Sequence, residues 1–126
     1  MTLYEACLRD DLEPQRLMEA LLATLPGEPD PLNREEMMGY IETLYWQFFR
    51  PEERQALAPR LERTLWNLLE QSSEVSGRAA YFRTYRTLAL SEPAVSRLYR
   101  IWNGSTSVPG LPLSENDRIE LAAALA

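Results

Sequence analysis

Apolar side chains recur every three or four residues along most of the chain. Between residues 14 and 25 they are Leu17, Leu21, Leu22 and Leu25. Spacings of i, i+3 and i+4 place side chains on one face of a helix, where they can be buried together. No segment alternates apolar and polar residues over more than a few positions, as a half-buried strand would. The pattern therefore predicts an all-α protein with no sheet.

Proline, glycine and short polar residues divide this pattern into about seven helices. We expect them at residues 2–9, 14–25, 31–49, 52–71, 81–89, 92–102 and from 114 onwards. Asp30 and Ser91 are predicted N-caps, because each precedes a proline suited to the first helical turn. Asn103-Gly104 is a predicted C-cap, and Ser114-Glu-Asn-Asp117 has the spacing of a capping box. Pro59 lies inside the fourth helix, so we expect a kink or a short entry helix there.

The order of these helices also predicts how they are arranged. Helices of 10 to 20 residues, joined by short breaks into pairs of roughly 40 residues, are typical of helical-repeat solenoids. We therefore expect a superhelical array of antiparallel helix hairpins of the HEAT or armadillo type. A chain of 126 residues fits one such domain, residues 1–126.

Composition excludes several kinds of chemistry. The chain has no histidine and a single cysteine, Cys7, which we expect to be a small core residue on the first helix. Zinc sites of the usual kind need several His or Cys ligands, and Ser-His or Cys-His nucleophile pairs need a histidine. Acidic pairs such as Glu52-Glu53 lie in predicted first turns, where carboxylates favour the helix dipole. We therefore expect no catalytic residue and no metal ligand in this chain, although this composition does not exclude an enzyme that uses carboxylates alone.

The chain carries no predicted targeting signal and no apolar run near the roughly 20 residues of a membrane span. One thiol cannot form an internal disulfide, which suits a reducing compartment. We therefore expect a cytoplasmic protein with no membrane partner. With 19 acidic residues against 13 arginines, the formal charge is -6, and this disfavours nucleic acid as a partner.

The positive charge is concentrated near the end of the chain. From residue 76 to 103 there are five arginines and one acid, and four of these arginines form pairs spaced three apart on predicted helices: Arg83, Arg86, Arg97 and Arg100. Arginine presents a planar fork that binds carboxylates and phosphates, so these four are candidate peptide-binding residues. Two interpretations stay open, because the same arginines could pair with acidic residues on neighbouring helices or on a partner domain.

The order of segments resembles a known family. The second predicted helix ends in Leu25-Pro-Gly-Glu, the third ends in Tyr45-Trp-Gln-Phe-Phe-Arg-Pro, and Ala58-Pro-Arg-Leu-Glu follows. It closes with Ile-Trp-Asn-Gly, Val-Pro-Gly-Leu-Pro-Leu and Asp-Arg-Ile-Glu-Leu. Over nearly its whole length it resembles the C-terminal helical domain of aminopeptidase N-like zinc metallopeptidases, the gluzincin aminopeptidases.

The resemblance implies a function without chemistry in this chain. In that family the C-terminal domain is a superhelix of HEAT-like hairpins that covers the active-site chamber and helps to bind the peptide. Zinc and the catalytic motifs belong to a separate upstream domain, and none of those motifs occurs here. The chain would then be a fragment of a larger hydrolase, with that catalytic domain and the peptide as partners and one or more of the four arginines facing the chamber.

A domain cut from a larger enzyme should also expose an apolar patch. We expect it on the first helix and around Leu121 and Leu125 of the last.

The alternative to an accessory domain of an enzyme is a free-standing helical-repeat module that binds another protein. A third possibility, an RNA-binding repeat, predicts strongly salt-dependent binding through the arginine helices.

Overall fold

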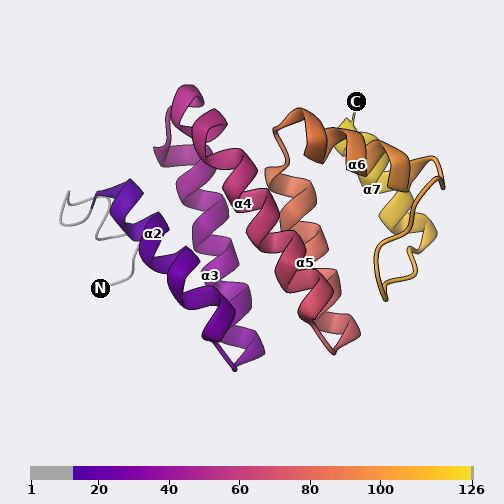
Figure 1. Ribbon diagram of the computed structural model, residues 1–126, viewed down its shortest axis with the longest axis horizontal. Helices are drawn as coiled ribbons and strands as arrows, with labels where there is room; N and C mark the ends of the chain where they lie inside the picture. The colour runs from indigo at the N-terminus through magenta and orange to yellow at the C-terminus, as the bar shows by residue number, and fades with distance from the viewer. Residues whose placement is uncertain (1–12, 126) are drawn as a thin grey trace. The chain divides into compact units, whose positions relative to one another are not determined.

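The computed structural model describes residues 13–125 of the chain (Figure 1). Its α-helices are α2 (Pro14–Thr24), α3 (Pro31–Thr43), α4 (Pro51–Gln71), α5 (Val75–Leu88), α6 (Glu92–Trp102) and α7 (Glu115–Leu125). A 3-10 turn, η1 (Leu25–Gly27), and a π-helical turn, η2 (Leu44–Phe48), follow α2 and α3. Residues 13–125 form no strand beyond one isolated bridge, so the all-α prediction is confirmed. The predicted helix at residues 2–9, with Cys7, lies outside the described residues.

The chain forms two compact units, and the division between them falls inside α4. Unit 1 extends to Ala56 and unit 2 begins at Leu57. The predicted short entry helix at Pro59 is wrong, because α4 continues through this residue as a single helix. The superhelical arrangement of the whole chain remains a prediction.

Unit 1 is built on the hairpin of α2 and α3. The two helices run antiparallel in Figure 1 and are in contact. Asp30 caps α3 as predicted, because its Oδ1 accepts a hydrogen bond from the Leu32 amide at 2.9 Å. The core of the hairpin consists of the predicted face Leu17, Leu21, Leu22 and Leu25, together with Met18, Met38, Ile41, Leu44, Tyr45 and Phe49.

The third predicted helix ends differently from the expectation. Instead of a regular α-helix to Phe49, it closes in the π turn η2, in which the Phe49 amide donates to the Leu44 carbonyl at 2.9 Å. A π turn brings residues five apart onto the same side. Leu44 and Phe49 are therefore both buried. Arg54 donates to the Tyr45 and Phe49 carbonyls, at 3.3 and 2.5 Å, and so satisfies groups freed at the helix end.

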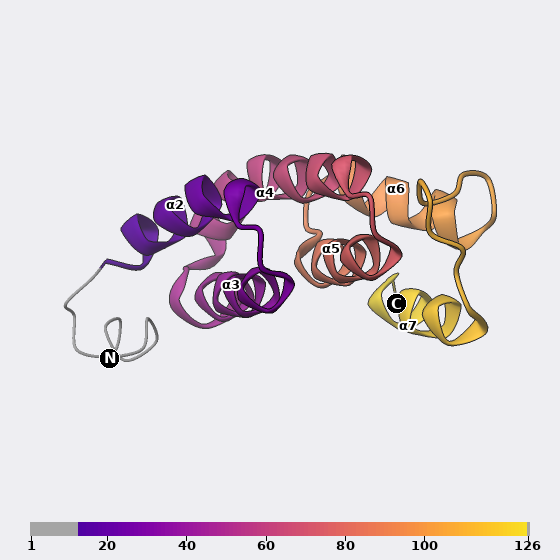
Figure 2. The same ribbon diagram turned by 90° about the horizontal axis from the view of Figure 1, so that it is seen from below.

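Unit 2 contains α5, α6, α7 and the part of α4 from Leu57 onwards. Helices α4 and α5 meet through the Trp66 and Tyr85 rings, whose centroids are 5.1 Å apart. Helices α6 and α7 lie side by side, as Figure 2 shows. Arg118 at the start of α7 donates to the Trp102 carbonyl at 2.8 Å and satisfies the end of α6.

The loop between α6 and α7 confirms two predicted caps. Gly104 has a φ of +86°, the left-handed conformation expected of a C-cap glycine. Ser114 and Asp117 form the predicted capping box, since each backbone amide donates to the other side chain, at 2.9 and 3.1 Å. Between Gly104 and Ser114 the chain turns at Pro109-Gly110, where the Leu111 amide donates to the Val108 carbonyl at 3.1 Å. Val108 is buried and anchors this turn.

The prediction that Leu121 belongs to an exposed apolar patch on the last helix is wrong. This side chain is fully buried, because α7 packs its inner face against α5 and α6. The exposed large apolar side chains of unit 2 are Val95, Tyr99 and Trp102 of α6, Ile119 of α7, and Val75 and Leu90.

Candidate functional site

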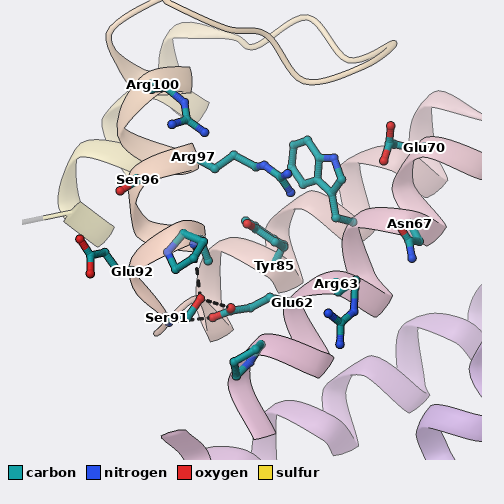
Figure 3. Close-up of a pocket in the computed structure, with 14 residues that line it drawn as sticks. Glu62, Arg63, Asn67, Glu70, Tyr85, Ser91, Glu92, Ser96, Arg97 and Arg100 are labelled. Atoms are coloured by element: carbon teal, nitrogen blue, oxygen red, sulfur yellow. Dashed lines mark hydrogen bonds between the residues drawn. The ribbon is translucent and has the colours of Figure 1, made fainter. Parts of the chain in front are cut away.

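Unit 2 has a pocket of about 740 Å³ between α4, α5 and α6 (Figure 3). Helix α4 supplies one wall, α6 and its N-terminal turn supply the other, and Tyr85 of α5 lies at the base. The lining residues are Pro59, Glu62, Arg63, Trp66, Asn67, Glu70, Tyr85, Ser91, Glu92, Pro93, Ala94, Ser96, Arg97 and Arg100. This volume suits a small ligand or a few residues of a peptide.

Arg97 crosses the pocket from α6 toward α4. Its guanidinium carbon lies 4.3 Å from the centroid of the Trp66 ring. Figure 3 shows the Arg97 side chain extending from α6 toward α4. A guanidinium over an indole face is attracted by the ring quadrupole. Trp66 is itself largely buried between α4 and α5. Arg97 is therefore held in one place on a rigid aromatic support.

Glu62 joins the two walls at the opposite end of the pocket. It is only 4 % exposed. Its Oε2 accepts hydrogen bonds from the Leu90 and Ser91 amides at 2.7 and 3.0 Å, and its Oε1 accepts one from the Ser91 hydroxyl. Ser91 is also the predicted N-cap of α6, accepting from the Ala94 amide at 3.4 Å. The Glu62 charge thus offsets the positive end of the α6 dipole.

Tyr85 is a neutral, buried group beneath Arg97. Burial raises the pKa of its phenol, because the charged form would lose its hydration. The Arg97 guanidinium acts in the opposite direction, and the Glu62 carboxylate adds to the rise in pKa. The phenol therefore stays protonated at neutral pH and offers a hydrogen-bonding group to Arg97.

Three guanidinium groups line the pocket: Arg63, Arg97 and Arg100. Among the described residues, none of them forms an ion pair with a carboxylate. Glu62 is committed to the α6 N-terminus, so its charge is already compensated. Glu70 and Glu92 lie at the two sides of the pocket in Figure 3, on α4 and α6. The pocket therefore presents cationic groups that are available to an anion, between two flanking carboxylates.

The structure brings together two of the four predicted arginines. Arg97 and Arg100 line the pocket, whereas Arg83 and Arg86 do not. Arg83 lies exposed on α5. Arg86 forms an ion pair with Glu120 of α7, with Nη2 and Oε2 2.9 Å apart, and its side chain is 12 % exposed. The interpretation that some of these arginines pair with neighbouring helices therefore holds for Arg86.

Sequence reasoning missed the residues that α4 and α5 contribute, above all Arg63, Trp66 and Tyr85. Trp66 and Tyr85 are large aromatic residues at helical spacing, which is typical of core positions, and both are buried. Arg63 precedes Trp66 by three residues, a spacing that places the two on one helix face. Nothing in the sequence indicates that this face lies opposite α6.

Within residues 13–125, no three side chains of the metal-binding types lie close enough together to hold a metal ion. Within the same part of the chain, no helix combines the length and the apolar character that crossing a membrane requires.

Comparisons of the chain with protein-family models, with curated proteins and with solved structures find no match.

Proposed function

We propose that this chain is a peptide-binding helical module whose unit 2 binds a peptide C-terminal carboxylate in the pocket between α4, α5 and α6. The observation that carries the proposal is the set of three arginines, Arg63, Arg97 and Arg100, which line one pocket without a carboxylate partner among the described residues. A guanidinium fork matches a carboxylate in geometry and charge.

The support beneath Arg97 makes it the main ligand-binding residue. A flexible arginine loses side-chain entropy when a ligand fixes it. Arg97 already lies against Trp66 and above Tyr85, so binding orders it little further. This preorganisation favours affinity at Arg97 over Arg63 and Arg100, both of which are exposed.

The flanking groups favour a peptide over a polyanion. Glu70 and Glu92 would repel a ligand that carries several negative charges in a row. A peptide terminus has a single carboxylate, and its preceding residues can contact the apolar surface of Pro59, Pro93 and Ala94. The formal charge of -6 likewise disfavours nucleic acid.

The broader role that we propose is that of the C-terminal accessory domain of a zinc aminopeptidase. It is supported by the sequence resemblance and by the helical fold. In this role the chain has no catalytic residue, zinc is held by the catalytic domain of the parent hydrolase, and both that domain and the peptide substrate are its partners in the cytoplasm. The resemblance favours this role over that of a free-standing interaction module. A gene that continues upstream into an H-E-x-x-H segment would support it, and a gene without one would favour the alternative.

Calorimetric titration of the chain with a short peptide, as the free acid and as the C-terminal amide, tests the binding function. We expect the acid to bind about tenfold or more tightly, since a charge-assisted bond contributes roughly 1.5–3 kcal/mol. Arg97→Ala should abolish this preference and Arg100→Ala should reduce it. Arg83→Ala is the matched control, because Arg83 does not line the pocket. Equal affinity for acid and amide in the unmodified chain would contradict the proposal.

A further inference from the structure

Glu70 lines the pocket at a position where helix electrostatics disfavour an acidic residue. It is the last residue but one of α4 (Pro51–Gln71), and its side chain is exposed. The C-terminal end of a helix carries a partial negative charge, so the helix dipole repels a carboxylate in the last turn. This turn contains no basic residue, and Glu70 forms no ion pair or hydrogen bond with another described residue. The fold of α4 therefore gives no reason for an acidic residue here.

The other two carboxylates that line the pocket have structural explanations. Glu62 is buried and accepts hydrogen bonds from the Leu90 and Ser91 amides at the start of α6. Glu92 lies in the first turn of α6, where the helix dipole favours an acidic residue. Glu70 is thus the lining carboxylate that the fold leaves available to a ligand.

Glu70 lies across the pocket from Arg97, as Figure 3 shows. It follows Trp66 by four residues, which places both side chains on one face of α4 and about 6 Å apart along the helix axis. Pro59 precedes Trp66 by seven residues and lies roughly 10 Å from it in the other direction. A carboxylate bound at Arg97, over Trp66, therefore has the apolar proline surface on one side and the Glu70 carboxylate on the other.

We propose that Glu70 selects peptides whose C-terminal residue is lysine or arginine, a selection that rests on the proposed binding of the terminal carboxylate at Arg97. The carboxylate, the main chain and the side chain leave the last Cα atom in three directions. With the carboxylate at Arg97 and the main chain leaving toward Pro59, the side chain extends toward Glu70. The long stem of lysine or arginine spans about one helical turn, so its charged end pairs with the Glu70 carboxylate.

The charges of the two walls fit a ligand of this kind. Helix α6 presents Arg97 and Arg100, whereas the pocket wall of α4 ends in Glu70. A C-terminal lysine or arginine carries one negative and one positive group, and so complements both walls. A C-terminal aspartate or glutamate would instead place a second carboxylate beside Glu70 and would be repelled.

Four versions of one short peptide test this selection in the full 126-residue chain. They end in lysine or in norleucine, which keeps an apolar stem without the ammonium group, and each is made as the free acid and as the C-terminal amide. Titration calorimetry gives the affinity of each peptide for the unmodified chain, for Glu70→Gln and for Glu92→Gln. Glu92→Gln is the matched control, because it removes the other exposed carboxylate of the pocket.

We expect the unmodified chain to bind the lysine acid about threefold to fivefold more tightly than the norleucine acid, as an exposed ion pair provides. Glu70→Gln should bind both acids alike, and Glu92→Gln should keep the preference for lysine. The Tm of Glu70→Gln should equal or exceed that of the unmodified chain, since this variant loses a charge that the helix dipole disfavours.

Equal affinities of the unmodified chain for the lysine and norleucine acids would overturn the selection and leave the carboxylate pocket in place. A lysine preference that survives Glu70→Gln, or that Glu92→Gln removes, would also overturn it, because another group would then read the side chain. A lower Tm of Glu70→Gln would contradict the premise that α4 does not need this acidic residue. Equal affinities for acid and amide would instead contradict the proposed function itself.

Discussion

The guanidinium carbon of Arg97 lies 4.3 Å from the centre of the Trp66 ring, so a cation from α6 rests on an aromatic side chain from α4. Because Trp66 in turn contacts Tyr85 of α5, all three helices around the pocket determine the position of this one cation. The contact links the packing of unit 2 to its proposed ligand binding.

Replacing Trp66, the aromatic support of Arg97, should weaken peptide binding although the Arg97 cation remains. In Trp66→Leu, Arg97 keeps its charge but loses the aromatic surface that orders it, so we expect about a threefold to tenfold loss of affinity for a peptide acid. Calorimetry measures this loss. Trp102→Leu is the control, since Trp102 does not line the pocket. If Trp66→Leu binds like the unmodified chain, Arg97 does not depend on its support.

Removing the Glu62 carboxylate should destabilise unit 2 strongly. Glu62→Ala leaves the Leu90 and Ser91 amides and the Ser91 hydroxyl without their acceptor, and we expect a loss of about 3 kcal/mol in the free energy of unfolding. Ser91→Ala should cost about 1 kcal/mol, because α6 loses its N-cap. The losses should not add in the double variant, since the two side chains share a hydrogen bond. Additive losses in urea denaturation would contradict this coupling.

The buried Tyr85 phenol should lower the free energy of unfolding of the chain at alkaline pH. Its pKa in the folded state is raised, so the unfolded phenol ionises first as the pH rises through its ordinary value of about 10. The contribution of Tyr85 is therefore fully present below that value and is lost as the pH rises toward the folded pKa. We expect the stability difference between the unmodified chain and Tyr85→Phe to change in favour of the variant above pH about 10. A difference that stays constant with pH would show that Tyr85 titrates alike in both states.

Gly110 is required where the loop approaches α5. Its φ is +66°, and the Nη1 of Arg78 donates to its carbonyl at 3.4 Å. A methyl group at this position would overlap the Arg78 guanidinium. Gly110→Ala should therefore destabilise the chain by about 1–3 kcal/mol.

Gly104→Ala is a matched control for that substitution. Gly104 also has a positive φ, +86°, but no neighbouring atom lies where its methyl group would be. We expect Gly110→Ala to be the more destabilising of the two in thermal denaturation, and the added substitution Arg78→Ala to remove the excess. Equal effects at both glycines would leave only backbone strain as the cause.

Most of the helix boundaries could be predicted, because they depend on local chemistry. Asp30, Ser91 and Ser114 cap helices through hydrogen bonds to residues two or three positions away, and Gly104 adopts its conformation for local reasons. The π turn at Leu44–Phe48 could not be predicted, since it depends on how the core accepts Leu44 and Phe49 together.

The candidate site was predicted only in part, because it depends on contacts between distant residues. The local excess of arginine identified Arg97 and Arg100, but the same rule also included Arg86, which pairs with Glu120 of α7. Arg63 and Trp66 lie more than thirty positions before Arg97 in the chain, and only the packing of α4 against α6 makes them neighbours. Leu121 shows the same limit, since its burial depends on α5 and α6.

The most direct test of the proposed carboxylate pocket is a binding cycle that combines two changes, Arg97→Ala in the chain and acid to amide in the peptide. Titration calorimetry gives the four affinities. If Arg97 binds the carboxylate, the variant should lose about tenfold or more in affinity for the acid and almost nothing for the amide. Equal losses for acid and amide, or none for either, would show that Arg97 does not bind the terminal carboxylate and would contradict the central claim.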